Sequence, residues 1–508
     1  MTTYDDPLPA PENPQRRPDW PLCPKVRRAH VEALERMLDI VQTVEYAGHD
    51  TDFGVLTVGG GRYWPGIVVA CEMLRATGYD GPIEVWHGHH ANTEPVDYRD
   101  VRHLGVALVD ALAVAQTTRP RTLRGWEAKW HAIRHCRFRR LLYLDADAYC
   151  VADPQPMVEQ TLSVAPLAIW QDLPANEGTV RWGNLGLDGQ ATHSIQGGQY
   201  FLDRQEAWAY TLLVDWLCQH SDYYFAHGYG DQDMMRIAWA AMQQRVHRLG
   251  HAHWVYPAFV CSVNGQPVVV HRCRSKLVLP SDYVHFPTNQ LAGPNYALPS
   301  EREVWERFSA WCRAHQQDDA QVTFGAVWRS GIWGPGCGPD SDPHSRGSEY
   351  VQRVVALLTA AGAQQVVDAG CGDTRILQAL ARACPTARFH GVDATDCVFP
   401  PLDSLPGNCT VTTGDIRLVE ALPAGDVLLA KDVLMHWPTE AIRQWLRAVK
   451  ASRKWRLLVV TQDCQQQQDD THLGGYRGLD PARAPLAEFG PWAVLPYHHK
   501  AMCVRRLD

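Results

Sequence analysis

The chain lacks several features that would assign a protein to a broad class at once. No run approaches 18 consecutive apolar residues, so no membrane-spanning helix is expected. Residues 1–28 are acidic, then proline-rich, then basic, and they lack the apolar core of a secretion signal. The fifteen cysteines are scattered without a repeating Cys-x-x-Cys frame, and Cys150 and Cys371 lie in strand-end motifs. This pattern indicates reduced thiols and a cytoplasmic location.

The chain also has little excess of either charge. Its formal net charge is −8 and its pI is near 6.3, which argues against a broad, non-specific grip on nucleic acid. A local basic patch could still hide inside that sum, so nucleic acid is an unlikely partner but not an excluded one. Hydrophobic residues make up 45% and charged residues 20% of the chain, as in ordinary globular proteins.

At 508 residues the chain is too long for one core, and its pattern changes near the middle. Strand-like runs, among them 83–87 and 199–202, alternate from Phe53 onwards with helix-like runs, among them 64–77. This alternation favours an α/β fold with parallel sheets. Glycine and proline are dense between Gly325 and Gly347, which marks a loop before a second alternating pattern. The sequence therefore predicts two Rossmann-like units, with this division: an N-terminal extension at 1–50, a first unit at 51–300, a helical or linker segment at 301–325 and a second unit at 326–508.

The most informative segment is 141–151, an apolar strand that ends in Asp145 and Asp147. Positions i and i+2 of a strand point to the same face, and two carboxylates on one face repel unless a cation lies between them. Such oxygen ligands suit Mg²⁺ or Mn²⁺ and leave positions for phosphate oxygens. The segment therefore predicts a metal site for a nucleoside diphosphate leaving group. The plainer interpretation is a solvated strand end with two surface acids.

Other segments of the first half fit a nucleotide-sugar enzyme. A glycine turn follows the first expected strand, where the backbone can approach a nucleotide and Arg62 can meet a diphosphate. A Gly-Gly turn leads into another apolar strand, and two acids begin a later helix. The candidate residues of these segments and of the helix before the metal strand are Thr57, Gly59, Gly60, Arg62, Lys129, Gln199, Asp231 and Asp233.

In this order, the segments resemble the retaining GT-A glycosyltransferases, in particular the fungal α-mannosyltransferase family that elongates cell-wall mannans. The glycogenin-like transferases are more distant relatives, and the resemblance covers about residues 51–275. It implies that Asp147 binds the metal, that Asp145 contacts the metal or the nucleotide ribose, and that Lys129 holds the donor. Gln199 would lie beside the anomeric carbon, and Asp231 or Asp233 would contact the sugar or the acceptor.

The late part of this resemblance is less complete. In the glycogenin-like relatives a late histidine completes the metal shell, and His271, at the end of the expected strand 268–271, is the matching residue. Lys276 would lie near the phosphates, with Arg272 and Arg274. The lysine-proline-tryptophan part of the relatives' pattern is absent, so the alternative is a histidine that only packs at a strand end. No enzyme nucleophile is evident, which favours front-face attack by the acceptor hydroxyl, assisted by the leaving phosphate.

The second half carries a different glycine turn. Residues 366–373 form an apolar strand that runs into Gly370-Cys371-Gly372, at the strand end where doubly wound sheets bind ligands. The position where a dinucleotide site expects a third glycine is Arg375, which favours a single nucleoside ligand over NAD. Asp393 ends the next expected strand, where an acid can accept both ribose hydroxyls.

This order resembles the class I S-adenosylmethionine-dependent methyltransferases, from about residue 322 to the C-terminus. Small bacterial members share segments like 328–334 and 474–477 of this chain. The resemblance implies that Asp368, Gly370, Gly372, Asp393 and Asp415 bind S-adenosylmethionine. Methyl transfer to a hydroxyl needs a base within reach, and the candidates at strand ends are His436, Asp432 and Asp463.

Both units together predict a bifunctional transferase, since tethering raises the effective concentration of a second site. It would move a hexose from a nucleotide sugar, GDP-mannose or UDP-hexose, to a saccharide acceptor with Mn²⁺ or Mg²⁺. It would then methylate the glycan with S-adenosylmethionine. The alternatives are glycosylation and methylation of a modified nucleic-acid base, or a non-catalytic nucleotide-sugar-binding scaffold.

Overall fold

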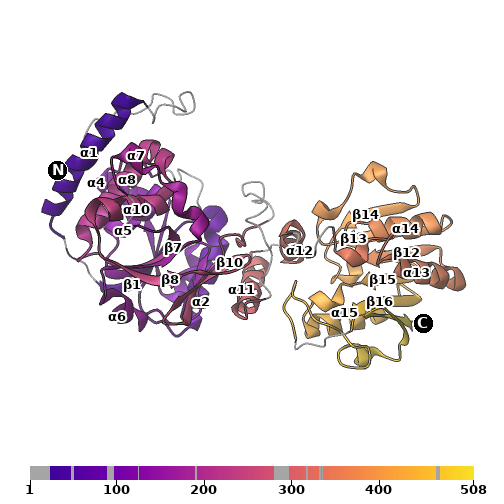
Figure 1. Ribbon diagram of the computed structural model, residues 1–508. Coiled ribbons are helices and arrows are strands. Elements are labelled where there is room, and N and C mark those ends of the chain that lie inside the picture. The colour runs from indigo at the N-terminus through magenta and orange to yellow at the C-terminus, as the bar shows by residue number, and fades with distance from the viewer. Residues whose placement is uncertain are drawn as a thin grey trace. The chain divides into compact units, whose positions relative to one another are not determined.

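The computed structural model divides into two compact units, Met1–Val278 and Leu279–Asp508 (Figure 1). It describes residues 23–46, 48, 51–88, 96–123, 125–188, 192–279, 297–315, 319–330, 333, 336–464 and 470–507. Helices α11 (Ser300–Ala314) and α12 (Asp319–Ser330) group with the second unit. The domain boundaries drawn from the sequence at residues 300 and 325 stay predictions. Among the described residues, no helix has both the length and the apolar character needed to cross a bilayer.

The first unit is built on a seven-stranded sheet in the order β3-β2-β1-β4-β7-β6-β8. Strands β1 to β4 pair in parallel, but β7 runs antiparallel to both of its neighbours. The expectation of parallel sheets is therefore wrong at β7, because a strand's apolar pattern gives no information about its direction. The strands are β1 (Thr51–Val58), β2 (Ile83–His87), β3 (Val106–Asp110), β4 (Phe138–Asp145), β6 (Leu167–Gln171), β7 (Ile195–Asp203) and β8 (Val246–His251).

A second, four-stranded sheet in the order β5-β11-β10-β9 closes the strand-end edge of this unit. The chain turns directly from β4 into β5, and β11 pairs antiparallel with β5, so that His271 lies opposite Ala148. The late strand β11 is thereby brought back to the acidic turn. The strands are β5 (Ala148–Cys150), β9 (His253–Val255), β10 (Ala258–Val263) and β11 (Gln266–His271).

Helices cover both faces of the large sheet (Figure 1). The first helix packs against α7 and α8 through a buried stripe that includes Leu34 and Met37, so it belongs to the core of this unit. The helices are α1 (Pro24–Thr43), α2 (Trp64–Ala76), α3 (Tyr98–Val101), α4 (Ala111–Thr118), α5 (Glu127–His135), α6 (Met157–Leu162), α7 (Trp182–Leu185), α8 (Trp208–Gln219), α9 (Ser221–Tyr224) and α10 (Gly230–Met242).

The second unit contains a seven-stranded sheet in the order β14-β13-β12-β15-β16-β18-β17. Strands β12 to β16 are parallel, and β18 pairs antiparallel with β16. The strand order reverses at β12, which leaves a crevice at the carboxyl ends of β12 and β15. The strands are β12 (Gln365–Ala369), β13 (Arg388–Asp393), β14 (Cys409–Thr413), β15 (Val427–Lys431), β16 (Leu457–Asp463), β17 (Ala493–Tyr497) and β18 (Lys500–Arg506), with helices α13 (Ser348–Ala361), α14 (Arg375–Ala383) and α15 (Thr439–Ser452).

Candidate active sites

Three potential metal ligands converge at the edge between the two sheets of the first unit. Asp145 is the last residue of β4, Asp147 lies in the turn before β5, and His271 ends β11. One ligand atom from each lies within 4.8 Å of the others. The i, i+2 spacing predicts both acids on one strand face, but β4 ends at Asp145 and Asp147 lies in the turn. The turn still brings the two carboxylates together. Two carboxylates and an imidazole form a mixed oxygen and nitrogen donor set that fits Mn²⁺ better than Mg²⁺, which prefers oxygen ligands.

The orientation of His271 follows from two side chains behind it. The Nε2 of Gln196 donates to Asp172, because a carboxylate can only accept, and this leaves Gln196 Oε1 facing His271 Nδ1 at 3.1 Å. Nδ1 must therefore carry a proton. In the neutral ring the lone pair is then on Nε2, which lies 3.3 Å from Asp147 Oδ1. Two electron-rich atoms at that distance need a cation or a further proton between them, as expected at a metal site.

The strand behind His271 is shaped to accept the ring. A Cβ built on Gly198 would lie 2.5 Å from Cε1 of His271, so only glycine leaves room for the imidazole here. Asp172 is held by four donors, the backbone N–H of Leu173 and the side chains of Asn176, Gln196 and Gln232. The imidazole is therefore fixed from behind by a buried and well-bonded support.

Lys276 stands on the other side of the acidic turn. Its Nζ contacts Asp147 Oδ2, and the side chain is largely buried. Burial raises the pKa of Asp147, but Lys276 and His271 outweigh it and hold the pKa well below the usual range. Asp147 is thus a carboxylate at neutral pH, ready to bind a cation, with an ammonium group beside it.

Lys129 joins the metal strand to helix α10. Its Nζ lies 2.9 Å from Asp145 Oδ1, 2.7 Å from Asp231 Oδ2 and 3.0 Å from the carbonyl oxygen of Gly197. Burial alone lowers the pKa of Lys129, but the two carboxylates raise it above its ordinary value. Burial also raises the pKa of Asp231. Lys129 and Asp231 therefore border the metal cluster on the side of β7.

Two other predicted site residues, Gln199 and Asp233, make their hydrogen bonds with residues outside this cluster. Gln199 is fully buried, and its Nε2 lies 2.9 Å from the Sγ of Cys261 on β10. Its expected position beside an anomeric carbon stays a prediction. Asp233 is also fully buried; it accepts from the backbone N–H of Tyr229 at 2.6 Å and pairs with Arg236 at 3.0 Å. Its contacts hold the start of α10.

The predicted glycine turn lies next to the acidic turn. Val58, which follows Thr57 on β1, pairs with Asp145 on β4, and a Cβ on Gly59 would lie 3.5 Å from the Cβ of Ala146. Thr57 itself is buried, Gly60 is buried, and Arg62 is exposed. Tyr63, which the sequence argument did not single out, lies close enough to Lys276 and Asp147 to feel both charges, and burial raises its pKa.

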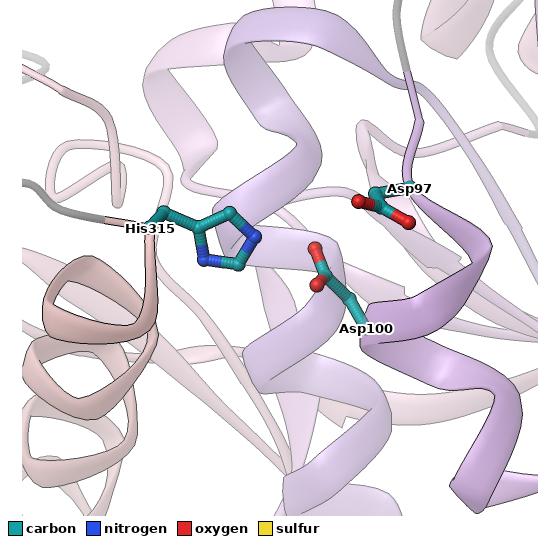
Figure 2. A group of neighbouring side chains, drawn as sticks. All are labelled: Asp97, Asp100 and His315. Carbon is teal, nitrogen blue, oxygen red and sulfur yellow. The ribbon is translucent and has the colours of Figure 1, made fainter.

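Another pair of carboxylates in the first unit has local structural roles. Figure 2 shows Asp100 on the short helix α3 and Asp97 just before its first residue. Asp97 accepts from the backbone N–H of Arg99 at 2.9 Å and caps the helix, and Asp100 accepts from Trp64 Nε1 at 2.8 Å. His315, also labelled, follows α11 in the second unit, where its ring stacks on Trp311 with centroids 4.0 Å apart.

The second unit encloses a cavity of about 270 Å³ at the carboxyl ends of its parallel strands. All five residues predicted to bind S-adenosylmethionine line it, namely Asp368, Gly370, Gly372, Asp393 and Asp415. Asp393 accepts from the backbone N–H of Gly372 at 2.9 Å. Burial raises the pKa of Asp393 to about 6 and that of Asp368 to about 7. Asp415 lies just beyond β14 and is bound by Arg417 at 2.8 Å.

Two of the candidate bases, His436 and Asp432, line the same cavity. His436 Nδ1 lies 2.6 Å from the carbonyl oxygen of Gly475, so Nδ1 is the donor and Nε2 keeps its lone pair. Burial lowers the pKa of His436, which keeps the ring neutral at pH 7. Asp432 Oδ2 accepts from Lys431 at 2.5 Å and from Lys500 at 2.6 Å. Burial raises the pKa of Asp432, but these two ammonium groups hold it well below the usual range, so His436 is the better base.

Several residues of these sites carry no signal in the sequence. Asp172, Gln196 and Tyr63 have no motif of their own, and Trp333 lies within the longer segment 328–334. Tyr476, in the segment 474–477, is a predicted pocket residue. The rings of Trp333 and Tyr476 lie 4.8 Å and 6.1 Å from that of His436. The hydroxyl of Tyr476 donates to Asp463, the third candidate base, at 2.6 Å.

Parts of the chain are similar to known transferases. Residues 52–162 match the model of a mannosyltransferase family, Mannosyl_trans3. Solved structures similar to parts of the chain include mouse xyloside xylosyltransferase 1 (14% identity, 39% of this chain and 85% of that chain, TM-score 0.30). They also include galactosyltransferase LgtC with donor and acceptor sugar analogues (16% identity, 38% of this chain and 72% of that chain, TM-score 0.28). A third is magnesium protoporphyrin IX methyltransferase from Synechocystis PCC 6803 with bound SAH (19% identity, 40% of this chain and 96% of that chain, TM-score 0.25).

No curated protein matches the chain. The family model covers the segment from β1 to α6, which includes Asp145 and Asp147. The solved structures have too little identity and overlap to support an inference about substrates. The chain thus has a mannosyltransferase-like region and the α/β fold expected from its sequence, and the assignment of chemistry rests on its own side chains.

Proposed function

We propose that this chain is a bifunctional transferase, with a metal-dependent glycosyltransferase in its first unit and an S-adenosylmethionine-dependent methyltransferase in its second. The observation that carries the first activity is the convergence of Asp145, Asp147 and His271 within 4.8 Å. The second is supported by the cavity whose lining joins Asp368 and Asp393 with His436. The similarity of residues 52–162 to mannosyltransferases favours GDP-mannose as the donor, with UDP-hexose as the alternative.

In the first unit, Asp145, Asp147 and His271 would hold Mn²⁺, which offsets the charge of a departing nucleoside diphosphate. Lys276 would bind a phosphate oxygen from beside Asp147. Lys129 and Asp231 would orient the transferred sugar, because both are buried, paired and adjacent to Asp145. Lys129 engages the carboxylate of Asp231, and the acceptor hydroxyl would attack and pass its proton to the leaving phosphate.

In the second unit, Asp393 would accept the ribose hydroxyls of S-adenosylmethionine, while Gly370 and Gly372 allow close contact of the backbone. His436 would take the proton of an acceptor hydroxyl through Nε2, because Nδ1 is committed to Gly475. When bound, S-adenosylmethionine would supply the methyl group to this oxygen, with its carbon–sulfur bond broken and a neutral thioether left behind. The glycan made by the first unit is the proposed acceptor.

The test uses the full-length protein with a panel of nucleotide sugars and Mn²⁺. A ligand that binds only the folded state stabilises the protein and so raises its melting temperature. At a ligand concentration of one hundred times the dissociation constant, the stabilisation is about 2.7 kcal/mol. We expect GDP-mannose to raise it with Mn²⁺ and to be hydrolysed slowly, and Asp147→Asn to lose both effects. Tritium from labelled S-adenosylmethionine should enter glycan. Label that enters DNA instead, or no response to any nucleotide sugar, would refute the proposal.

A further inference from the structure

Two large aromatic side chains of the first unit are exposed beside the metal cluster. Trp126 is 55% exposed and Tyr229 is 63% exposed, although aromatic side chains of this size are usually well buried. Their ring centroids lie 6.2 Å apart with an angle of 39° between the planes. The two exposed rings are tilted relative to each other and together form one aromatic surface.

The backbone beneath holds these rings in place. Gly230 has φ +61°, and a Cβ there would lie 2.5 Å from Cε3 of Trp126, so the indole rests directly on the glycine backbone. Phe225 flanks the same ring with centroids 6.3 Å apart. The fully buried Asp233 accepts from the backbone N–H of Tyr229. An exposed surface that is fixed in this way is preorganised for a ligand.

The two rings stand at the starts of the helices that carry the polar groups of the site. Trp126 directly precedes α5, which carries Lys129, and Tyr229 directly precedes α10, which carries Asp231. The ion pair between Lys129 and Asp231, at 2.7 Å, joins these two helix starts next to Asp145. The aromatic surface therefore lies on the β7 side of the cluster, whereas the glycine turn after β1 lies on the other side of β4.

We propose that Trp126 and Tyr229 form the platform on which the acceptor saccharide lies. The proposal rests on the proposed glycosyltransferase activity and names a binding surface for its acceptor. The C–H face of a pyranose packs on an aromatic ring, while its edge hydroxyls bind carboxylates and ammonium groups. Trp126 and Tyr229 supply the faces, and Asp231 supplies a carboxylate at the start of α10. A nucleotide base is the less suitable occupant, because the donor side of the site is the glycine turn after β1.

The experiment measures the dissociation constant of an α-linked mannotriose by calorimetry, with full-length protein, Mn²⁺ and GDP present. We expect Trp126→Ala and Tyr229→Ala each to raise it about tenfold, the loss of one ring contact. Trp126→Phe, which keeps a ring, should recover most of the affinity. The matched control is Tyr98→Ala, because Tyr98 is also 55% exposed but lies on α3.

The outcomes separate this platform from the activity on which it depends. Unchanged mannotriose affinity in both alanine variants overturns the platform, as does a wild-type protein that binds no mannotriose. A larger loss of affinity for GDP than for mannotriose also overturns it, because the rings would then hold the base. If the wild-type protein hydrolyses a nucleotide sugar with Mn²⁺, the proposed glycosyltransferase activity is supported whichever of these results is found. If it hydrolyses none, the proposed glycosyltransferase activity is itself refuted.

Discussion

The support behind His271 gives a sharp test of the metal site. Replacing Gln196 with methionine keeps the length of the side chain but removes both the bond to His271 Nδ1 and the bond to Asp172. The ring then loses the acceptor that fixes its proton on Nδ1. We expect Gln196→Met to bind Mn²⁺ more weakly by about 10- to 100-fold, or about 1.4 to 2.7 kcal/mol, as found for residues that orient metal ligands.

The assay is a titration of full-length protein with Mn²⁺, followed by the electron paramagnetic resonance signal of the free ion. Asn176→Ala is the matched control, because Asn176 also donates to Asp172 but does not contact His271. His271→Ala, which removes a ligand outright, should weaken binding more than Gln196→Met does. A folded Gln196→Met protein with the wild-type dissociation constant for Mn²⁺ would refute the orientation argument, and Mn²⁺ binding by wild-type protein would still support the metal site.

Three further predictions concern both units. Gly198→Ala should weaken Mn²⁺ binding by at least tenfold, because its Cβ would displace the ring of His271; the same resonance titration measures this, and wild-type affinity would contradict it. His436→Gln should abolish methyl transfer while S-adenosylmethionine still binds in calorimetry, and the acid limb of the wild-type rate should lie below pH 6.5 because burial lowers the pKa of His436. An acid limb above that pH would point to another base. Affinity for S-adenosylmethionine should fall as the pH drops through about 6, where Asp393 becomes protonated and a weaker hydrogen-bond acceptor. Asp393→Asn should weaken binding at pH 8 and flatten this dependence, and an unaltered profile would exclude Asp393 as its origin.

The local elements could be predicted well from the sequence, because each depends on a short pattern. The strand at 83–87 has the predicted bounds, and the expected helix at 64–77 differs by one residue from the observed Trp64–Ala76. The expected strand at 199–202 was too short, since β7 begins at Ile195. That error hid Gln196, which lies three positions before Gln199 and therefore on the opposite face of the strand.

The contacts that complete the sites could not be predicted, because they join distant parts of the chain. Gln196 and His271 are 75 residues apart and meet only because β11 folds back on β5. The bond from Lys129 to Gly197 spans 68 residues. Nothing in the sequence near Asp147 shows that Lys276, 129 positions later, will neutralise it. The ligand types can thus be read from motifs, whereas their partners depend on the packing of the sheets.

Lys129 has a consequence for the order in which substrates arrive. One ammonium group is shared between Asp145, a proposed metal ligand, and Asp231, in the first turn of α10. A divalent ion that draws charge from Asp145 leaves Lys129 with one strong counter-charge, and its attraction to Asp231 then grows. Binding of the metal and the donor should therefore strengthen the ion pair at the start of α10. The side that binds the acceptor would become rigid only after the donor is bound. Kinetics with compulsory addition of the nucleotide first would be the natural outcome.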